Sequence, residues 1–194
     1  MAIPAQPILI LGGFLISPHT YTPMAARLQQ LSGQPVVVVP VSRAEWLLTV
    51  FAFAWARILD RVQTNASDLA RRSASGRITL IGHSSGGIML RQQVAQRLPG
   101  CPFADRVHYL SLAGDLDLES ATPLAQRLAP TAYRNSTGNA DDRGDGLVPV
   151  ASALLAGSTP LVLPGVAHGG AFGSRWYGSP EVVEQWWTAL QSQP

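Results

Sequence analysis

Short runs of mainly apolar, β-forming residues recur along this chain, and most of them stop at a glycine or a proline. Each run is too short for a stable helix, and apolar residues on both faces are typical of a strand buried within a sheet. The runs are Ile8–Leu11, Val36–Val39, Ile78–Ile81, Val107–Leu112 and Leu161–Leu163. Strands of this kind occur in parallel sheets that helices cover on both sides, so the runs predict the α/β class.

Segments with apolar residues at helical spacing lie between the runs. Helices are expected over Pro23–Leu31, from about Glu45 to Leu69, over Ile88–Leu98 and from about Pro180 to Leu190. The part from Thr122 to Asp145 is less regular, and only a short strand near Tyr133 is expected there. Because no linker or repeat interrupts the alternation, residues 1–194 are predicted to form one domain. Its central sheet is expected to be mostly parallel, with helices on both faces and no large lid or cap.

The composition excludes several classes of protein. Hydrophobic residues make up 46% of the chain and charged residues 13%, which argues against disorder. All 14 basic residues are arginines, so Schiff-base chemistry through a lysine is excluded. The arginines are spread out, with Arg71-Arg72 as the single tight pair, and this pattern predicts no nucleic-acid partner. The single cysteine, Cys101, excludes an intramolecular disulfide and a cysteine-cluster metal site.

Neither the first residues of the sequence nor its most apolar stretch predicts a membrane location. Residues 1–7 lack the basic start and apolar centre of a secretory signal, so a cytoplasmic location is expected. The most apolar helical stretch, Trp46–Ala56, is too short to span a bilayer, so no integral membrane segment is expected. It is read either as a buried helix, or as one whose Trp46, Val50 and Phe53 line an acyl pocket or an interfacial patch.

One of the predicted strands ends in an unusual turn. Ile78–Ile81 runs into Gly82-His83-Ser84-Ser85-Gly86-Gly87 and then into a predicted helix. Glycines at positions 82 and 86 fit a sharp strand-to-helix turn, where a side chain would strike the adjacent strand or helix. A phosphate-binding loop would need a lysine, and a dinucleotide site would need another glycine spacing in the first strand–helix unit. The pattern therefore favours Ser84 as a nucleophile.

Two further loops complete the pattern. Asp145 lies between glycines at 144 and 146, and His168 follows Pro164-Gly165-Val166-Ala167. Functional groups in a parallel sheet gather beyond the carboxyl ends of the strands, and the chain order here is Ser, Asp, His. With these motifs the chain resembles the α/β-hydrolases, and among them the small minimal lipases and esterases. The resemblance covers nearly the whole chain and implies Ser84 as nucleophile, Asp145 as acid and His168 as base.

The chemistry explains why these residue types are needed. A serine hydroxyl is a poor nucleophile at neutral pH, so an imidazole must take its proton, while a carboxylate orients and stabilises that imidazole. The oxyanion needs backbone donors, which the resemblance assigns to Ser85 and to the loop after the first strand. In that loop Phe14 is the first candidate and Leu15 the second. The loop reads Gly12-Gly13 where related lipases carry His-Gly, which is a departure from the pattern.

For several residues the sequence leaves the role open or indicates a role outside the triad. Asp115, at the end of the fourth predicted strand, is the alternative to Asp145 as the acid. His83 is expected to pack beside the nucleophile, and it joins Leu15 and His19 as a candidate for the substrate pocket. His108 is expected to be buried within its strand.

The resemblance implies a serine hydrolase of carboxylic esters that forms an acyl-enzyme, needs no cofactor or metal, and favours an apolar acyl group. Its expected partner is a small-molecule ester, with lipid-like esters included. Acyl transfer, thioester hydrolysis, a cofactor-free lyase and a non-catalytic binder of apolar ligands remain as alternatives on the same scaffold. The sequence determines neither the particular ester nor the oligomeric state.

Overall fold

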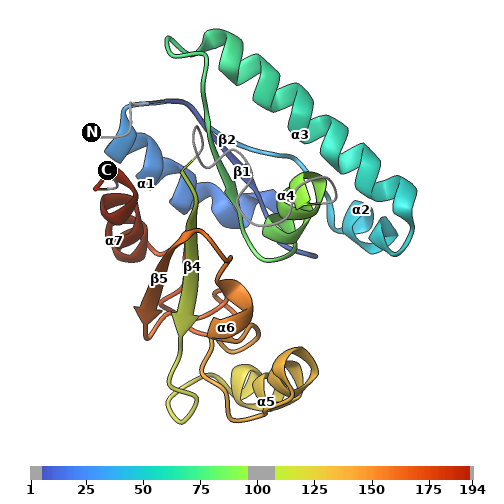
Figure 1. Cartoon of the computed structure of the whole chain (residues 1–194), viewed down its shortest axis with the longest axis vertical. Helices are drawn as coiled ribbons and strands as arrows, with labels where there is room; N and C mark the ends of the chain where they lie inside the picture. Colours follow the sequence, from blue (N-terminus) through green and yellow to red (C-terminus); the bar gives the residue numbers. More distant parts are fainter. Residues whose placement is uncertain (1–5, 96–107, 193–194) are drawn as a thin grey trace. The chain divides into compact units, whose positions relative to one another are not determined.

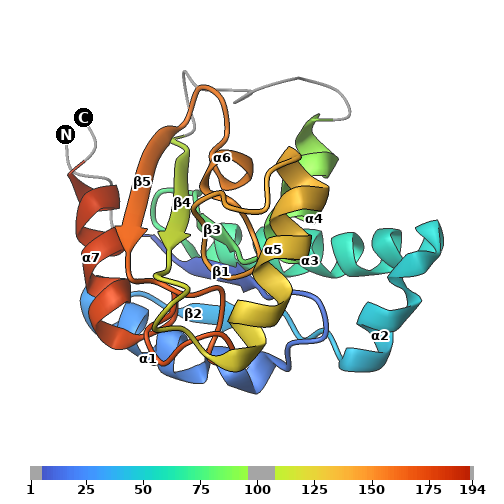
Figure 2. The same cartoon turned by 90° about the horizontal axis from the view of Figure 1, so that it is seen from below.

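The computed structural model describes residues 6–95 and 108–192. The chain divides into two compact units, unit 1 (Met1–Arg97) and unit 2 (Leu98–Pro194), and each is described by itself. Both units combine helices with short parallel strands, so the α/β class is confirmed (Figures 1 and 2). The prediction of one domain over the whole chain stays a prediction.

Unit 1 contains a three-stranded parallel sheet in the order β2-β1-β3. These strands are β1 (Ile8–Leu11), β2 (Val36–Val38) and β3 (Thr79–Gly82). Ile8 lies opposite Val36 on one side and Thr79 on the other, so the three strands run in step. Every residue of β1 is buried, as its uniformly apolar sequence predicts for a central strand.

Helices flank the sheet of unit 1. A 3-10 turn, η1 (Pro18–Tyr21), leads into α1 (Thr22–Ser32), which ends at Gly33 in the left-handed conformation. Figure 1 shows α3 (Ala52–Arg72) along one side of the strands and α1 along the other. The helix α4 (Ser85–Ala95) follows β3 directly. The main hydrophobic core joins β1 and the residues that follow β2 to α3 and α4. Its buried members are Leu9, Leu11, Val39, Val41, Trp46, Ile58, Val62, Leu69 and Met89.

The long helix expected from about Glu45 to Leu69 is wrong in one respect, because the structure divides it. A short helix α2 (Arg43–Leu47) and a 3-10 turn η2 (Leu48–Val50) precede α3. The extended residue Phe51 separates η2 from α3. Ser42 begins α2 with a complete capping box. The break is held by the Trp55 indole N–H, which donates to the Thr49 carbonyl at 2.7 Å.

Unit 2 contains two parallel strands, β4 (Leu110–Asp115) and β5 (Thr159–Pro164). β4 begins and ends later than the predicted strand Val107–Leu112, because His108 and Tyr109 precede the strand and it continues to Asp115. Val107 lies outside the described residues, as does Leu98 at the predicted end of the helix that follows β3. The helix α6 (Val150–Ala153) contacts β4. The last helix, α7 (Pro180–Gln191), buries Val182, Val183, Trp186 and Trp187.

The short strand expected near Tyr133 is wrong, because this region forms the helix α5 (Pro123–Thr137). Thr122 caps the helix by accepting a hydrogen bond from the Ala125 N–H at 3.3 Å. The buried residues Ala125, Ala129 and Tyr133 recur every four positions, which is a helical stripe. Pro130 within the helix obscures this stripe in the sequence, because proline usually ends a helix.

Two further properties concern the described residues as a whole. None of their helices is both long and apolar enough to cross a bilayer. They also hold no group of three or more His, Cys, Asp or Glu side chains placed to bind a metal ion.

Candidate active site

Ser84 lies at the turn between β3 and α4 in unit 1, with φ of 54°. Left-handed backbone is uncommon for a residue with a side chain and costs free energy that the surrounding structure must offset. The neighbouring glycines make the turn possible. A Cβ at Gly82 would lie 2.6 Å from the Gly87 Cα, and one at Gly86 would lie 2.3 Å from the Gly12 carbonyl oxygen. Both contacts are the clashes predicted from the sequence, one with the helix and one with the adjacent strand.

The loop after β1 lies against this turn. A Cβ at Gly13 would come within 2.9 Å of the Ser84 Cβ, so only a glycine allows the loop so close. Leu15 has φ of 59°, and it is the other non-glycine residue with positive φ among the described residues. The Ile16 N–H closes the loop by donating to the Gly13 carbonyl at 3.2 Å. Backbone strain in unit 1 therefore concentrates at the candidate nucleophile and the candidate oxyanion loop.

Three backbone N–H groups are candidate oxyanion donors in unit 1. Ser85 is the first residue of α4, where an N–H has no partner within the helix. Neither the Phe14 N–H nor the Leu15 N–H donates a hydrogen bond to another part of the described chain. Phe14 and Leu15 are exposed on the loop that follows Gly13. The structure leaves both loop donors open as candidates beside Ser85.

His83 is held by Tyr21, a residue that the sequence did not single out. The Gly13 N–H donates to the Tyr21 hydroxyl oxygen at 2.8 Å, and the same hydroxyl lies 2.7 Å from His83 Nδ1. Tyr21 therefore links the loop after β1 to the residue that precedes Ser84. Burial raises the pKa of Tyr21 to about 12, despite the hydrogen bond from Gly13 that lowers it. The His83 side chain is therefore buried and held by Tyr21 in the turn beside Ser84.

In unit 2, His168 and Asp145 form a buried pair. His168 Nδ1 lies 2.9 Å from Asp145 Oδ2, and the side chains are 6% and 3% exposed. The backbones are joined as well, since the His168 N–H donates to the Asp145 carbonyl at 2.8 Å. The Phe172 ring packs edge-on against the imidazole, with centroids 5.7 Å apart. The pair has the geometry of a base oriented by a carboxylate.

The other oxygen of Asp145 is held by its own loop. Asp145 Oδ1 accepts hydrogen bonds from the Leu147 N–H at 3.0 Å and the Val148 N–H at 2.7 Å. Burial disfavours the carboxylate, but the hydrogen bond and charge of His168 and these two backbone donors outweigh it, so the pKa of Asp145 is lowered. The carboxyl group is therefore held in its charged form although it is buried.

Two tyrosines of unit 2 also contact this loop region. The Tyr177 hydroxyl donates to Asp145 Oδ2 at 3.0 Å and accepts from the Gly114 N–H at 2.6 Å. The Tyr133 hydroxyl accepts from the Gly146 N–H at 2.7 Å. Sequence reasoning missed Tyr21, Tyr133 and Tyr177, because the bonds to their glycines span up to 63 residues and follow no local pattern.

The remaining sequence candidates have other surroundings. Asp115 pairs with Arg143, whose Nε donates to Oδ1 at 3.1 Å, so within unit 2 the carboxylate that contacts His168 is that of Asp145. His19 is exposed on η1. The expectation for His108 is wrong, because it is exposed just before β4.

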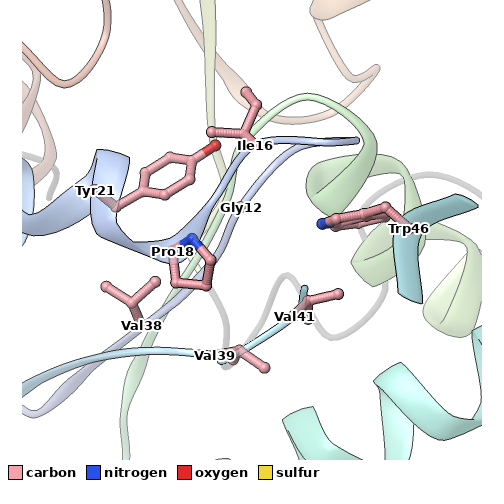
Figure 3. A pocket seen from close by; sticks show the side chains of 8 residues that line it. All are labelled: Gly12, Ile16, Pro18, Tyr21, Val38, Val39, Val41 and Trp46. Carbon is pink, nitrogen blue, oxygen red and sulfur yellow. The ribbon is translucent and has the colours of Figure 1, made fainter. Parts of the chain in front are cut away.

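A shallow hollow lies beside the start of the loop after β1. Figure 3 shows the Tyr21 and Trp46 rings among its lining side chains. The complete lining is Gly12, Ile16, Pro18, Tyr21, Val38, Val39, Val41 and Trp46. The hollow is too narrow to admit a water molecule, so in this conformation it cannot hold an ester.

An exposed apolar cluster lies over α2, η2 and the start of α3. Its residues are Leu47, Leu48, Phe51 and Phe53, each more than 40% exposed. The Phe51 and Phe53 rings stack with centroids 5.8 Å apart. The neighbouring residue Trp46 is buried, and its ring packs edge-on against that of the exposed Phe14, with centroids 6.1 Å apart. The two readings of Trp46–Ala56 thus apply to different residues, since Trp46 is core and Phe53 is exposed, while the Val50 side chain lies outside what the structure describes.

Comparisons of the chain with protein-family models, with curated proteins and with solved structures found no match. The candidate site therefore rests on its own geometry. Unit 1 carries Ser84 and the backbone donors, and unit 2 carries the His168–Asp145 pair.

Proposed function

We propose that the protein is a serine hydrolase of carboxylic esters, of the α/β-hydrolase type, with Ser84, His168 and Asp145 as its catalytic triad. The observation that carries the proposal is the strained turn of Ser84 between a strand and a helix. The buried His168–Asp145 pair supplies the second half of the machinery. The proposal requires that units 1 and 2 bring Ser84 Oγ within hydrogen-bond reach of His168 Nε2.

The reaction follows from the chemistry of these groups. His168 Nε2 takes the Ser84 hydroxyl proton while Oγ attacks the ester carbonyl carbon. The negative charge that develops on the carbonyl oxygen is stabilised by the Ser85 N–H and by that of Phe14 or Leu15. His168 then gives its proton to the leaving alcohol, which departs and leaves an ester on Ser84. Water, deprotonated by the same imidazole, hydrolyses that acyl-enzyme and restores the hydroxyl.

An apolar acyl group suits the exposed cluster at 47–53. Exposed apolar side chains that lie together favour a surface that contacts an apolar ligand or partner. The Phe14 ring connects the candidate oxyanion loop to Trp46, which directly precedes this cluster in the chain. A substrate with a medium or long acyl chain would cover these rings, whereas an acetyl ester would leave them in water.

Labelling with a fluorophosphonate tests the nucleophile. Wild-type protein is expected to be labelled, and Ser84→Ala is expected to lose the label completely. Ser85→Ala is the matched control, since it removes the neighbouring hydroxyl but keeps the backbone N–H. If wild type is not labelled, or if Ser84→Ala is labelled equally, the proposed nucleophile is wrong, and a non-catalytic binder becomes the better interpretation.

A panel of esters graded by acyl length tests the substrate class. Wild type is expected to prefer longer acyl chains. Phe53→Ser is expected to lower kcat/KM for those chains by about tenfold, because the acyl chain would no longer bury the Phe53 ring when it binds. Leu31→Ser, an exposed apolar residue of α1, is the control and should leave the profile unchanged. A preference for acetyl esters, or equal profiles for wild type and Phe53→Ser, would contradict an apolar acyl site at this cluster.

A further inference from the structure

Three buried tyrosines share one arrangement, in which the hydroxyl oxygen accepts a hydrogen bond from a glycine N–H. The pairs are Tyr21 with Gly13, Tyr133 with Gly146, and Tyr177 with Gly114. Each phenol keeps its own proton to donate, because its oxygen serves as the acceptor. The three tyrosines differ in the group that can accept this proton. In unit 2 only the Tyr177 hydroxyl, of the two, donates to a carboxylate within the described residues.

The acceptor of the Tyr177 proton is the same atom that faces the candidate base. Asp145 Oδ2 lies 3.0 Å from the Tyr177 hydroxyl and 2.9 Å from His168 Nδ1. With Leu147 and Val148 on Oδ1, the carboxylate has four donors, which is about the full number it can accept. Two donors that share one oxygen compete for its negative charge, so a strong bond from the phenol weakens the bond to the imidazole.

We propose that Tyr177 is a positioning residue that fixes Asp145 Oδ2 and limits how strongly this oxygen holds the His168 imidazole. This inference deepens the proposed function, because it rests on His168 as the base. A base held too tightly by its carboxylate stays protonated at higher pH and gives its proton up less readily. The Tyr177 hydroxyl sets that balance through Asp145, without touching the substrate.

The surroundings of Tyr177 keep its hydroxyl protonated. Burial and the charge of Asp145 raise the pKa of Tyr177, so it remains a donor across the physiological range. Gly114 allows the contact, since a Cβ there would lie 3.1 Å from the hydroxyl oxygen and 2.8 Å from the Asp145 Cβ. Among the described residues of unit 2, the other ionisable groups that act on Asp145 and the two tyrosines are His168, Tyr133 and Asp115, which is paired with Arg143.

The test compares Tyr177→Phe with Tyr133→Phe. Both variants remove a buried phenol hydroxyl and leave a glycine N–H without its partner, so their structural costs are matched. Only Tyr177→Phe also removes a donor from Asp145 Oδ2. The first readout is the proton NMR signal of the His168 Nδ1–H, assigned by its loss in His168→Asn. It is expected to move downfield in Tyr177→Phe, because the bond to the carboxylate becomes stronger, and to stay in place in Tyr133→Phe.

The second readout is the acid limb of kcat/KM against pH. In Tyr177→Phe its midpoint is expected to move to higher pH by about 0.5 unit or more, because the imidazolium is better stabilised once the competing donor is gone. A purely structural role would lower the amount of active protein without moving this midpoint. If Tyr177→Phe and Tyr133→Phe give the same signal and the same midpoint, the inference is wrong.

A second variant covers the case in which Tyr177→Phe does not fold. Replacement of Tyr177 by 3,5-difluorotyrosine keeps the hydroxyl and makes it a stronger donor, so the signal should move upfield and the midpoint to lower pH. An unchanged signal in this variant would overturn the inference. The NMR readout needs no substrate, so it separates a failure of this inference from a failure of the proposed hydrolase, which fluorophosphonate labelling reports.

Discussion

At the scale of single residues, the clearest feature is a buried charge with a complete set of partners. An isolated carboxylate in the interior would take up a proton, because burial disfavours its charged form. Asp145 keeps its charge because His168, Tyr177 and two N–H groups of its own loop surround both oxygens. The local sequence around Asp145 supplies only the two loop donors, and the other two come from residues further along the chain.

Replacement of Asp145 by asparagine should therefore destabilise the protein in a way that depends on pH. The folded pKa of Asp145 lies below its unfolded value, so its contribution is fully present above the unfolded pKa of about 4 and is lost as the pH falls through the folded pKa. In urea unfolding at pH 7, Asp145→Asn should lose roughly 1–3 kcal/mol relative to wild type. This difference should shrink as the pH falls below about 4.

The control is Asp141→Asn, which changes an exposed residue in the same loop region. It should unfold at the same urea concentration as wild type at pH 7. A loss of stability in Asp145→Asn that is equal at pH 7 and at low pH would show that the charge of Asp145 contributes nothing.

At the scale of elements, the position of α4 depends on how closely it approaches the end of β1. Gly86 lies in the first turn of α4, and its Cα faces the carbonyl groups of Leu11 and Gly12. A helix can come this close to a strand only where it carries no side chain. The same approach brings the loop after β1 against Ser84, so the packing of two elements creates the geometry of the candidate oxyanion site.

Gly86→Ala should separate α4 from β1 and destabilise unit 1. The added methyl group would lie 2.3 Å and 2.5 Å from two backbone carbonyl oxygens, which cannot move as a flexible side chain could. We expect a loss of about 2 kcal/mol or more in urea unfolding, together with a loss of fluorophosphonate labelling. Gly170→Ala is the control, because nothing lies within 4 Å of a Cβ at that position, and it should change stability by less than about 0.5 kcal/mol. Equal effects of the two substitutions would mean that the close approach is unimportant.

At the scale of the whole molecule, the candidate triad draws on both units. A lid in the described part of unit 2 would have to come from the segment between β4 and Asp145. Most of this segment forms the helix α5. This helix is fixed at both ends, because the Thr122 hydroxyl donates to the Ala171 carbonyl at 3.1 Å and Tyr133 binds the Gly146 N–H. Its buried stripe packs into unit 2 like any core helix.

We therefore expect no strong activation at a lipid interface, since no free lid in this segment would have to open. The rate of ester hydrolysis should rise smoothly with substrate concentration and should not jump above the solubility limit of the ester. The measurement is the initial rate over a concentration series that crosses this limit. A water-soluble ester measured over the same range is the control. A jump of more than about tenfold with the insoluble ester alone would mean that the protein opens at interfaces.

The sequence by itself determined the strands, most of the helices and the residue types of the candidate site. It could do so because these features depend on neighbours in the chain: the apolar run of β1, the glycines on either side of Ser84 and the cap of a helix act over a few residues. It failed where a local signal was ambiguous, as at Pro130 within α5 and at the break before Phe51. Only the tertiary structure decided that Asp145, and not Asp115, contacts His168 in unit 2, and that Tyr21, Tyr133 and Tyr177 hold the glycine loops. Those choices are made by packing between residues that lie 8 to 63 positions apart, beyond the reach of a helical or strand period.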